Sequence, residues 1–562
     1  MKKFLFTMLI LLPIMVNAES VKVDGIYYNL ITKAKVAEVT RNPNRYRGDI
    51  VIPASFTYED VEYNVTRIGE YAFYECIDLA SVIIPSSVTD IKISAFEGCS
   101  SMTSVSIPNS VTDIKYRTFK DCSSLNNVSI PNSVTNVGWE AFWGCSRMNV
   151  LTIGNNVSSI GAGAFRECSS LTSIFIPNSL KIIEGDAFWG CSSLTSVHIS
   201  DLAAWCNIEF GDNPLAIAHH LYLDEKEIKN LVIPASVTTI SKYAFQNCSS
   251  LISVTIPNSV TSIGEGTFLG CSALTSIKIP DNMTDIGRLA FGACSGLETI
   301  SIPNSVTVLG EGSFSGCNRL NSVNLPNSLI SIEGAMFSGC SSLTSIIIPN
   351  SVTSIGQYAF EDCTGLTTAI IPNSVTCIAN DVFSGCYALT SICLPNSVTT
   401  IGDGAFAKCS GLSSIIIPNS VVNIGKRCFD GCSGITSVTI GNNVTQIGSL
   451  SFANCPELTN VYCLAEKVPS IMAYFGGETT DAFAGSYIEY ATLHVLATSL
   501  DAYKAAEPWK NFKNIVVYDP SGIQDITLDK DSNAPVYDLN GRRLTEPAKG
   551  INIIGGKKAI VQ

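Results

Sequence analysis

His219 and His220 are adjacent in the chain and lie close in sequence to several acidic residues. Imidazole and carboxylate groups are ligands for Zn²⁺ and other divalent metals. Adjacent residues on a strand point to opposite faces, however, so the pair could not converge on one ion. We therefore expect no metal site, and we keep His219 and His220 as candidates for contact with a partner.

Motifs for catalysis are absent from the sequence. The chain has 4 His among 562 residues and contains no Gly-x-Ser-x-Gly elbow. His198 and Asp201 have no nucleophile identified beside them. Gly-x-Gly recurs, as at 264–266, but never as Gly-x-Gly-x-x-Gly, which excludes the usual dinucleotide signature. We expect a protein that is not an enzyme and binds no cofactor; a hydrolase without a familiar motif is the alternative.

The chain contains 21 Cys, whose thiols can form disulfides, and 16 of them follow a Phe by three residues. In an exported protein such residues usually suggest disulfides, and copies stacked at the ~4.8 Å spacing of paired strands are close enough to bridge. Copies in register carry parallel Cα–Cβ bonds, however, and each Cys follows an apolar Phe. We therefore expect free buried thiols that act as small hydrophobes, with disulfides as the alternative. Five Cys lie outside this series and lack Cys-x-x-Cys spacing: Cys206, Cys377, Cys393, Cys428 and Cys463.

These Phe and Cys residues belong to a unit of 23 residues that recurs through most of the chain. The phenylalanines of the unit are Phe73, Phe96, Phe119, Phe142, Phe165, Phe188, Phe245, Phe268, Phe291, Phe314, Phe337, Phe360, Phe383, Phe406, Phe429 and Phe452. A fixed period of this length is typical of a solenoid, in which each repeat packs only on its neighbours.

One copy, residues 251–272, shows what each repeat should form. Val254 and Ile256 lie two residues apart, which predicts a short strand with both side chains inward. Pro257 lacks an N–H and ends that strand. A second extended piece follows, and the segment around Phe268 is long enough for one short helical turn. The predicted fold is a repeat solenoid rich in β-structure, with short parallel strands and a short helical turn in each repeat.

The repeat also resembles a known family. The pattern L-x-x-[VI]-x-[IL]-P-x-x-[VL]-x-x-I-G-x-x-A-F-x-x-C is similar to the BspA-like class of leucine-rich repeats, found in bacterial surface proteins. One copy is carried by Leu343, Ile346, Ile348, Pro349, Val352, Ile355, Gly356, Ala359, Phe360 and Cys363. The resemblance covers about residues 60 to 460. It implies a leucine-rich-repeat solenoid that binds host extracellular-matrix proteins, host cells or other bacteria, and it leaves the ligand open.

The segments outside the repeats suggest export and capped ends. Lys2-Lys3, an apolar core and Val16-Asn17-Ala18 predict a signal peptide at 1–18. No other apolar run approaches the ~20 residues of a membrane span. Residues 19–66 read as an N-terminal β cap, 67–460 as the repeat array, and 461–518 as a C-terminal cap.

The tail, residues 519–562, carries a second resemblance. Val536-Tyr537-Asp538-Leu539-Asn540-Gly541-Arg542-Arg543 and the segment 549–558 look like the end of the C-terminal sorting domain of the type IX secretion system. By pattern alone the tail is a two-strand module with a Gly turn. The resemblance implies passage across the outer membrane, followed by display or release. A small β module in the periplasm is the alternative.

The array is interrupted at 200–230, where the Ala-Phe-x-x-Cys signature is missing. Insertions in solenoids form loops on one face, often the binding face. Trp205 and Tyr222 in this stretch, with Phe175, would serve as stacking platforms if the ligand were a glycan. The alternative is that Trp205 and Phe210 replace the missing Phe in the core.

One outward strand position is apolar in four successive repeats, at Ile347, Ile370, Cys393 and Ile416. Contiguous exposed apolar surface often marks a partner site, although Ile also suits any strand.

The net charge of −13 argues against nucleic acid and anionic membranes as partners. Only 15% of residues are charged, so the exposed faces should be mainly Ser, Thr and Asn. We expect a monomeric adhesin at the cell surface or outside the cell, with the periplasm as the alternative location. Many weak polar contacts and a few apolar anchors would bind a macromolecule. A glycan-binding surface protein and a structural surface-layer component are the alternative functions.

Overall fold

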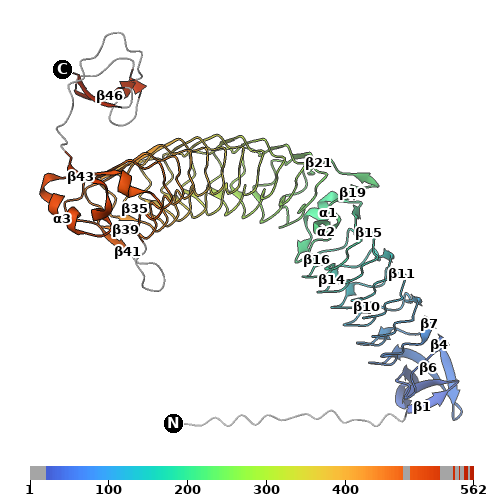
Figure 1. Ribbon diagram of the computed structural model, residues 1–562. Helices are drawn as coiled ribbons and strands as arrows, with labels where there is room; N and C mark the ends of the chain where they lie inside the picture. Colours follow the sequence, from blue (N-terminus) through green and yellow to red (C-terminus); the bar gives the residue numbers. More distant parts are fainter. Residues whose placement is uncertain are drawn as a thin grey trace, which may run out of the picture. The chain divides into compact units, whose positions relative to one another are not determined.

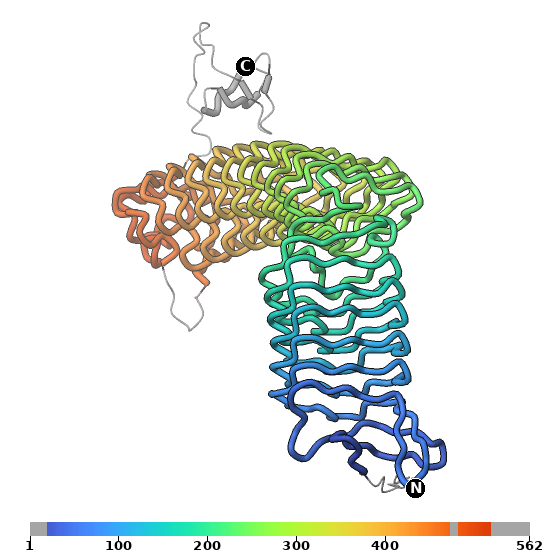
Figure 2. The backbone as a smooth tube through the Cα atoms, turned by 90° about the vertical axis from the view of Figure 1, so that its right-hand side faces the viewer, coloured from blue at the N-terminus to red at the C-terminus, as the bar shows by residue number. Residues whose placement is uncertain are grey.

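The computed structural model describes residues 20–472 and 481–518 and, in the tail, the backbone of 536–537, 543–544, 550–554 and 557–561. The predicted signal peptide lies outside the described residues. The chain divides into two compact units, hereafter unit 1 (Met1–Lys229 with Ile240–Ser250) and unit 2 (Asn230–Thr239 with Leu251–Gln562). Within each unit the chain winds in stacked turns, as the ribbon of Figure 1 and the tube of Figure 2 show. The predicted repeat solenoid is confirmed.

Unit 1 begins with a sheet of alternating apolar and polar residues, the predicted cap. Its strands are β1 (Ser20–Val23), β2 (Ile26–Ile31), β3 (Val36–Val39), β5 (Ser55–Tyr58) and β6 (Val61–Ile68), with the 3₁₀ turn η1 (Thr32–Ala34). They are ordered β1-β2-β3-β6-β5, and β8 (Asp90–Ile91) of the first repeats pairs with β6 in parallel. The cap sheet is therefore hydrogen-bonded to the repeat stack.

Each repeat places two short strands on two walls. In unit 2, for example, Val254 and Ile256 are buried while Thr255 is exposed, because successive side chains of a strand alternate between faces. Equivalent strands of successive repeats pair in parallel and in register, as at Val254↔Ile277. We call the solvent side of the first wall the strand face.

In unit 1 the first wall is β4 (Gly48–Val51), β7 (Leu79–Ile83), β9 (Ser104–Ser106), β11 (Asn127–Ser129), β13 (Val150–Thr152), β15 (Ser173–Phe175), β17 (Ser196–Ile199) and β19 (Leu221–Leu223). Its second wall is β8, β10 (Asp113–Ile114), β12 (Asn136–Val137), β14 (Ser159–Ile160), β16 (Ile182–Ile183) and β18 (Glu209–Phe210).

In unit 2 the first wall is β21 (Asn230–Val232), β22 (Ser253–Thr255), β24 (Ser276–Lys278), β26 (Thr299–Ser301), β28 (Ser322–Asn324), β30 (Ser345–Ile347), β32 (Thr368–Ile370), β34 (Ser391–Cys393), β36 (Ser414–Ile416), β38 (Ser437–Ile440), β40 (Asn460–Cys463), β42 (Thr492–Val495) and β43 (Asn514–Val517). Its second wall is β23 (Ser262–Ile263), β25 (Asp285–Ile286), β27 (Val308–Leu309), β29 (Ser331–Ile332), β31 (Ser354–Ile355), β33 (Cys377–Ile378), β35 (Thr400–Ile401), β37 (Asn423–Ile424), β39 (Gln446–Gly448) and β41 (Ser470–Met472).

The third side of the repeat differs from the predicted helical turn. In the repeat of Phe291 the N–H of Phe291 donates to Ser313 O of the next repeat at 2.9 Å, whereas the N–H of Cys294 donates to Phe291 O within its own turn at 3.2 Å. Leu289 and Ala293 take positive φ of 53°, which directs alternate N–H groups along the stack. Hydrogen bonds thus run between repeats here too, and no helix forms. We call the solvent side of this segment, from three residues before each Phe to two after it, the turn face.

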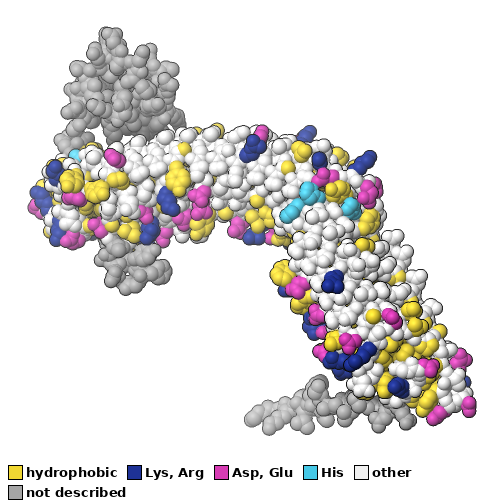
Figure 3. Space-filling model, turned by 45° about the vertical axis from the view of Figure 1, so that its right-hand side comes forward, with side chains coloured by type: hydrophobic (Ala, Val, Ile, Leu, Met, Phe, Trp, Pro, Cys, Tyr) yellow, Lys and Arg dark blue, Asp and Glu magenta, His cyan; other side chains and the backbone are white. Residues whose placement is uncertain are grey.

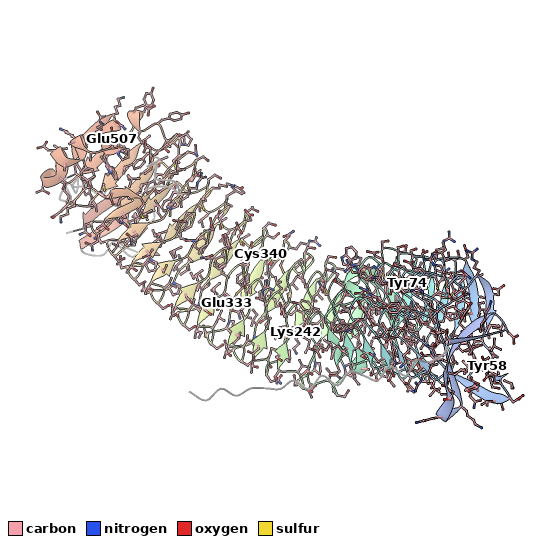
Figure 4. All side chains as sticks on the ribbon, turned by 90° about the horizontal axis from the view of Figure 1, so that it is seen from below. Tyr58, Tyr74, Lys242, Glu333, Cys340 and Glu507 are labelled. Atoms are coloured by element: carbon pink, nitrogen blue, oxygen red, sulfur yellow. The ribbon has the colours of Figure 1, made fainter. Side chains whose placement is uncertain are left out.

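The core holds two ladders. The Phe rings of successive repeats stack with centroids 4.9–5.5 Å apart in unit 1 and 5.2–5.7 Å apart in unit 2. Beside them most of the repeat thiols donate to the carbonyl of the preceding repeat's Phe, as Cys340 (labelled in Figure 4) does to Phe314 O at 3.3 Å. The repeat cysteines are buried free thiols, which confirms the prediction.

The interruption at 200–230 is a modified turn of the stack, and the prediction of a surface loop is wrong. It comprises α1 (Leu202–Cys206), β18, α2 (Leu215–Ala218), β19 and β20 (Lys226–Glu227). β18 pairs with β16 and β19 pairs with β17, both in parallel, so both walls continue. The Asp201 carboxylate caps α1 by accepting from Ala203 N at 2.8 Å.

Residues 481–518 end the ladders of unit 2. Phe483 stacks on Phe452 at 5.5 Å, and Ser486 stands where a Cys would, donating to Phe452 O. Trp509 and Phe512 then meet Phe483 edge-on. This segment contains η2 (Ile488–Tyr490), η3 (Ala497–Ser499), α3 (Leu500–Ala505) and η4 (Trp509–Asn511).

The described residues of the tail form four short strands, where the sequence predicted two. They are β44 (Val536–Tyr537), β45 (Arg543–Leu544), β46 (Gly550–Ile554) and β47 (Lys557–Val561), in the antiparallel order β45-β44-β46-β47.

Candidate functional site

The strand face of unit 2 carries the predicted apolar line, hereafter the apolar stripe: Ile347, Ile370, Cys393 and Ile416. The parallel register aligns Ile347 with Ile370 and Ile370 with Cys393. The three isoleucines are 71%, 61% and 65% exposed, and Cys393 is exposed as well. The structure therefore brings the four side chains onto one solvent-facing surface, which is unusual for residues of this type.

Polar residues around the stripe are less free to bind than the sequence suggested. The Thr367 hydroxyl donates to Thr344 O at 2.9 Å, and the Thr390 hydroxyl donates to Thr367 O at 3.3 Å. The serine of most Pro-Asn-Ser turns also donates to the preceding repeat, as Ser351 does to Leu329 O at 2.6 Å. These hydroxyl protons stabilise the stack. Much of the face visible in Figure 3 is neither charged nor hydrophobic, in keeping with the predicted composition.

In unit 1 the equivalent strand position holds three rings in adjacent repeats. Phe175 is aligned with His198, and His198 is aligned with Tyr222. The His198 and Tyr222 rings stack with centroids 4.8 Å apart, and Phe175 is 42% exposed. Phe175 and Tyr222 thus lie on one face, as a pair of platforms would require.

Trp205 does not belong to any surface, and its prediction as a partner-binding residue is wrong. It is 1% exposed, its ring lies 5.0 Å from that of Phe210, and its Nε1 donates to Ala244 O at 2.9 Å. Trp205 and Phe210 fill the core where the repeat Phe is missing, which was the alternative interpretation.

His219 and His220 follow the end of α2, and the strand placement assumed for them is wrong, because β19 begins only at Leu221. His219 takes a φ of 65° and its Nδ1 lies 3.2 Å from Asn247 O. His220 Nδ1 lies 2.6 Å from Glu227 Oε1, and this hydrogen bond lowers the pKa of the Glu227 carboxyl. Within residues 20–472 and 481–518, no group of three or more His, Cys, Asp or Glu is placed to hold a metal ion.

On the strand face of unit 2 the same strand position continues past the apolar stripe to two rings that the sequence analysis did not single out. Thr439 is aligned with Tyr462, and Tyr462 with His494; the latter two rings stack at 4.3 Å. Tyr518 meets Tyr462 edge-on at 5.5 Å and lines a pocket of about 850 Å³ with Asn442 and other polar residues. The continuing register from Thr439 was the signal that could have found this group.

Comparison with known protein families identifies the repeat. A model of the BspA-type leucine-rich repeat region matches residues 54–169, 91–214, 215–344, 287–411 and 332–459. No curated protein matches the chain.

Several solved structures are similar. A leucine-rich repeat protein from Bacteroides ovatus ATCC 8483 is 27% identical, with 80% of this chain and 99% of that chain covered and a TM-score of 0.40. A leucine-rich cell surface protein from Faecalibacterium prausnitzii A2-165 is 26% identical, covering 66% and 94%, with a TM-score of 0.36. The pneumococcal vaccine antigen PcpA is 17% identical, covering 89% and 99%, with a TM-score of 0.29. Because the family model matches most of the length, this chain belongs to the BspA-type leucine-rich repeat family.

Proposed function

We propose that this chain is an exported, non-enzymatic adhesin that binds a protein partner through the strand face of unit 2. The observation that carries the proposal is the apolar stripe of Ile347, Ile370, Cys393 and Ile416, exposed across four aligned repeats. Targets of the class that the family resemblance implies are extracellular-matrix proteins, host cells or other bacteria.

The chemistry of the stripe favours a protein over a glycan. Isoleucine offers no planar ring on which a sugar could stack, but it fits the apolar core of a protein–protein interface. Burial of an exposed Ile contributes about 1.5–3 kcal/mol, so three anchors supply most of a specific interaction. The neighbouring strand residues Ser345, Thr368 and Ser414 are small, so a partner can approach the stripe closely.

The proposed location rests on sequence. The leader at 1–18 supports export, and the resemblance of the tail to a type IX sorting domain supports display or release at the outer surface. No helix among residues 20–472 and 481–518 has the length and apolar character needed to cross a bilayer. Protease treatment of intact cells, with a blot of the medium, tests this part: full protection without release would place the chain in the periplasm.

The binding proposal is tested with the variant Ile370→Asp/Ile416→Asp. Binding to an immobilised, solubilised basement-membrane extract should weaken at least about tenfold, because each Asp puts a charge at the interface core. Ile330→Asp is the matched control, since Ile330 is 65% exposed but precedes the second-wall strand β29. Equal binding by the double variant and the control would contradict the proposal.

A further inference from the structure

The turn face of unit 1 carries alternating cations and indole rings in four successive repeats. The residue after each repeat Phe is Lys120, Trp143, Arg166 and then Trp189. Lys120 Nζ lies 3.8 Å from the centre of the Trp143 ring, and Arg166 Cζ lies 4.8 Å from Trp143 and 4.3 Å from Trp189. Cation–π contacts of this kind hold the side chains in a fixed row.

The cations of this row are already paired with carboxylates. Glu140 Oε2 accepts from Lys120 Nζ at 2.9 Å and from Arg117 Nε at 2.8 Å. Arg166 Nη1 donates to Asp186 Oδ2 at 2.9 Å. The surface therefore presents oriented donors and acceptors with little unpaired positive charge, and a polyanion would meet Glu140 and Asp186.

Two tryptophans beside this row are open to solvent. Trp139 is 58% exposed and Trp189 is 52% exposed, although Trp is usually among the more buried residues. Trp143 and Trp189 occupy the same repeat position two repeats apart, so they are separated by about 10 Å when paired strands are ~4.8 Å apart. The face thus offers repeated aromatic surfaces along one direction, and Trp139 adds one three residues before Phe142.

The fold does not require these side chains. At the position that follows the repeat Phe, unit 2 has only small, acidic or single apolar residues: Leu269, Gly292, Ser315, Ser338, Glu361, Ser384, Ala407, Asp430 and Ala453. Those repeats stack with the same ring geometry. The large side chains of unit 1 must therefore be explained by something outside the core.

We propose that the turn face of unit 1, built on Trp139, Trp143, Arg166 and Trp189, binds a neutral polysaccharide. Exposed indole faces stack on the apolar C–H faces of pyranose rings, because the ring face carries negative charge density. The paired Glu140 and Asp186 carboxylates and the Arg166 guanidinium hydrogen-bond to sugar hydroxyls. A linear polymer matches a surface that repeats along the stack, and many weak contacts add up along its length. This site is separate from the apolar stripe, so either proposal can fail alone.

The experiment is native affinity electrophoresis of the full mature protein in gels that contain one of four neutral polysaccharides, mannan, laminarin, xyloglucan or dextran, with a heparin gel as the anionic comparison. At least one of these polysaccharides should retard the protein. The variant Trp139→Gln/Trp189→Ser, which installs the residues found at Gln357 and Ser315 of unit 2, should weaken the interaction about tenfold. Tyr490→Gln is the matched control, because Tyr490 is exposed but lies outside the turn face of unit 1.

Three results would overturn the proposal. They are no retardation by any of the four polysaccharides, equal retardation of the double variant and wild type, or retardation by heparin alone, which would indicate an anionic ligand. Far-UV circular dichroism and the melting temperature confirm that the variant is folded.

Discussion

Unit 1 and unit 2 share a core and differ at the surface. Both stack repeat Phe rings within 5.7 Å, and in both most repeat Cys thiols donate to the preceding Phe carbonyl, as at Cys168 and Cys317. Unit 2 carries the apolar stripe on its strand face and small residues at most of the positions that follow a repeat Phe. Unit 1 carries tryptophans with cations stacked on them on its turn face.

The difference shows which positions the solenoid constrains. Packing on the next copy restricts the residue type at the inward strand positions and at the Phe and Cys positions, because a side chain of the wrong size disturbs both neighbouring repeats. Outward strand residues and the residue after Phe touch solvent and vary freely, so partner specificity can be built there. Substitutions at such positions usually change stability by less than about 0.5 kcal/mol.

Of the changes we predict, a rise to alkaline pH should lower the stability of the folded state most, and it should destabilise both units. Burial raises the pKa of the thiols of Cys145, Cys168, Cys294 and Cys317 well above the usual value near 8.5. Since the folded state holds these protons more tightly, its stability is intact below about pH 8.5 and falls as the pH rises further. Each thiol costs about 1.4 kcal/mol per pH unit above its unfolded pKa.

We therefore expect cooperative unfolding of both units between about pH 9 and 10.5, monitored by far-UV circular dichroism. Hydrogen exchange analysed by mass spectrometry assigns the loss to each unit. Retention of both units at pH 11 would show that the thiol ladder does not stabilise the stack as described.

Truncation of one Phe in each unit should produce the next largest loss of stability. Phe142→Ala and Phe314→Ala each remove a fully buried ring from a stack and should cost about 3–5 kcal/mol. Urea unfolding measures the change. Similar losses of unfolding free energy would support the conclusion that the two units have the same kind of core. A loss in only one of the two variants would contradict it.

The substitution Trp189→Ser should change the stability least. Because Ser occupies the same position at Ser338 and Ser384, the urea midpoint should move by less than the equivalent of about 0.5 kcal/mol. The lost contact with Arg166 is partly replaced by solvent. A cost above about 2 kcal/mol would mean that the turn face of unit 1 is part of its structural core.

Much of this architecture can be predicted from the sequence because each copy of the repeat can be compared with the others. The spacing of Phe245, Phe268 and later copies predicts the stack, and the register then places Ile370 beside Cys393. Where the repeat is interrupted, the sequence left two interpretations of Trp205 open, a partner contact or a replacement for the missing Phe, because no neighbouring copy shows which way its side chain points. The structure supports the replacement, since Trp205 is buried within α1.

The turn face escaped prediction for a related reason. In unit 1 its side chains converge because residues such as Glu140 and Glu167 adopt positive φ, a conformation that only glycine adopts readily and that their residue type does not predict. Trp143 and Arg166 are 23 residues apart, and their contact depends on that backbone. The partner roles of Phe175, Tyr222, His219 and His220 stay predictions.

Two exposed thiols provide the most direct test of the stripe. Cys393 lies within the apolar stripe and Cys377 lies on the second wall, while the other 19 thiols are buried. Native protein is treated with a maleimide, with and without the solubilised basement-membrane extract, and the rate at each site is read by mass spectrometry. The account predicts that the extract slows labelling of Cys393 and leaves the labelling rate of Cys377 unchanged. Equal rates at Cys393 with and without the extract would contradict it.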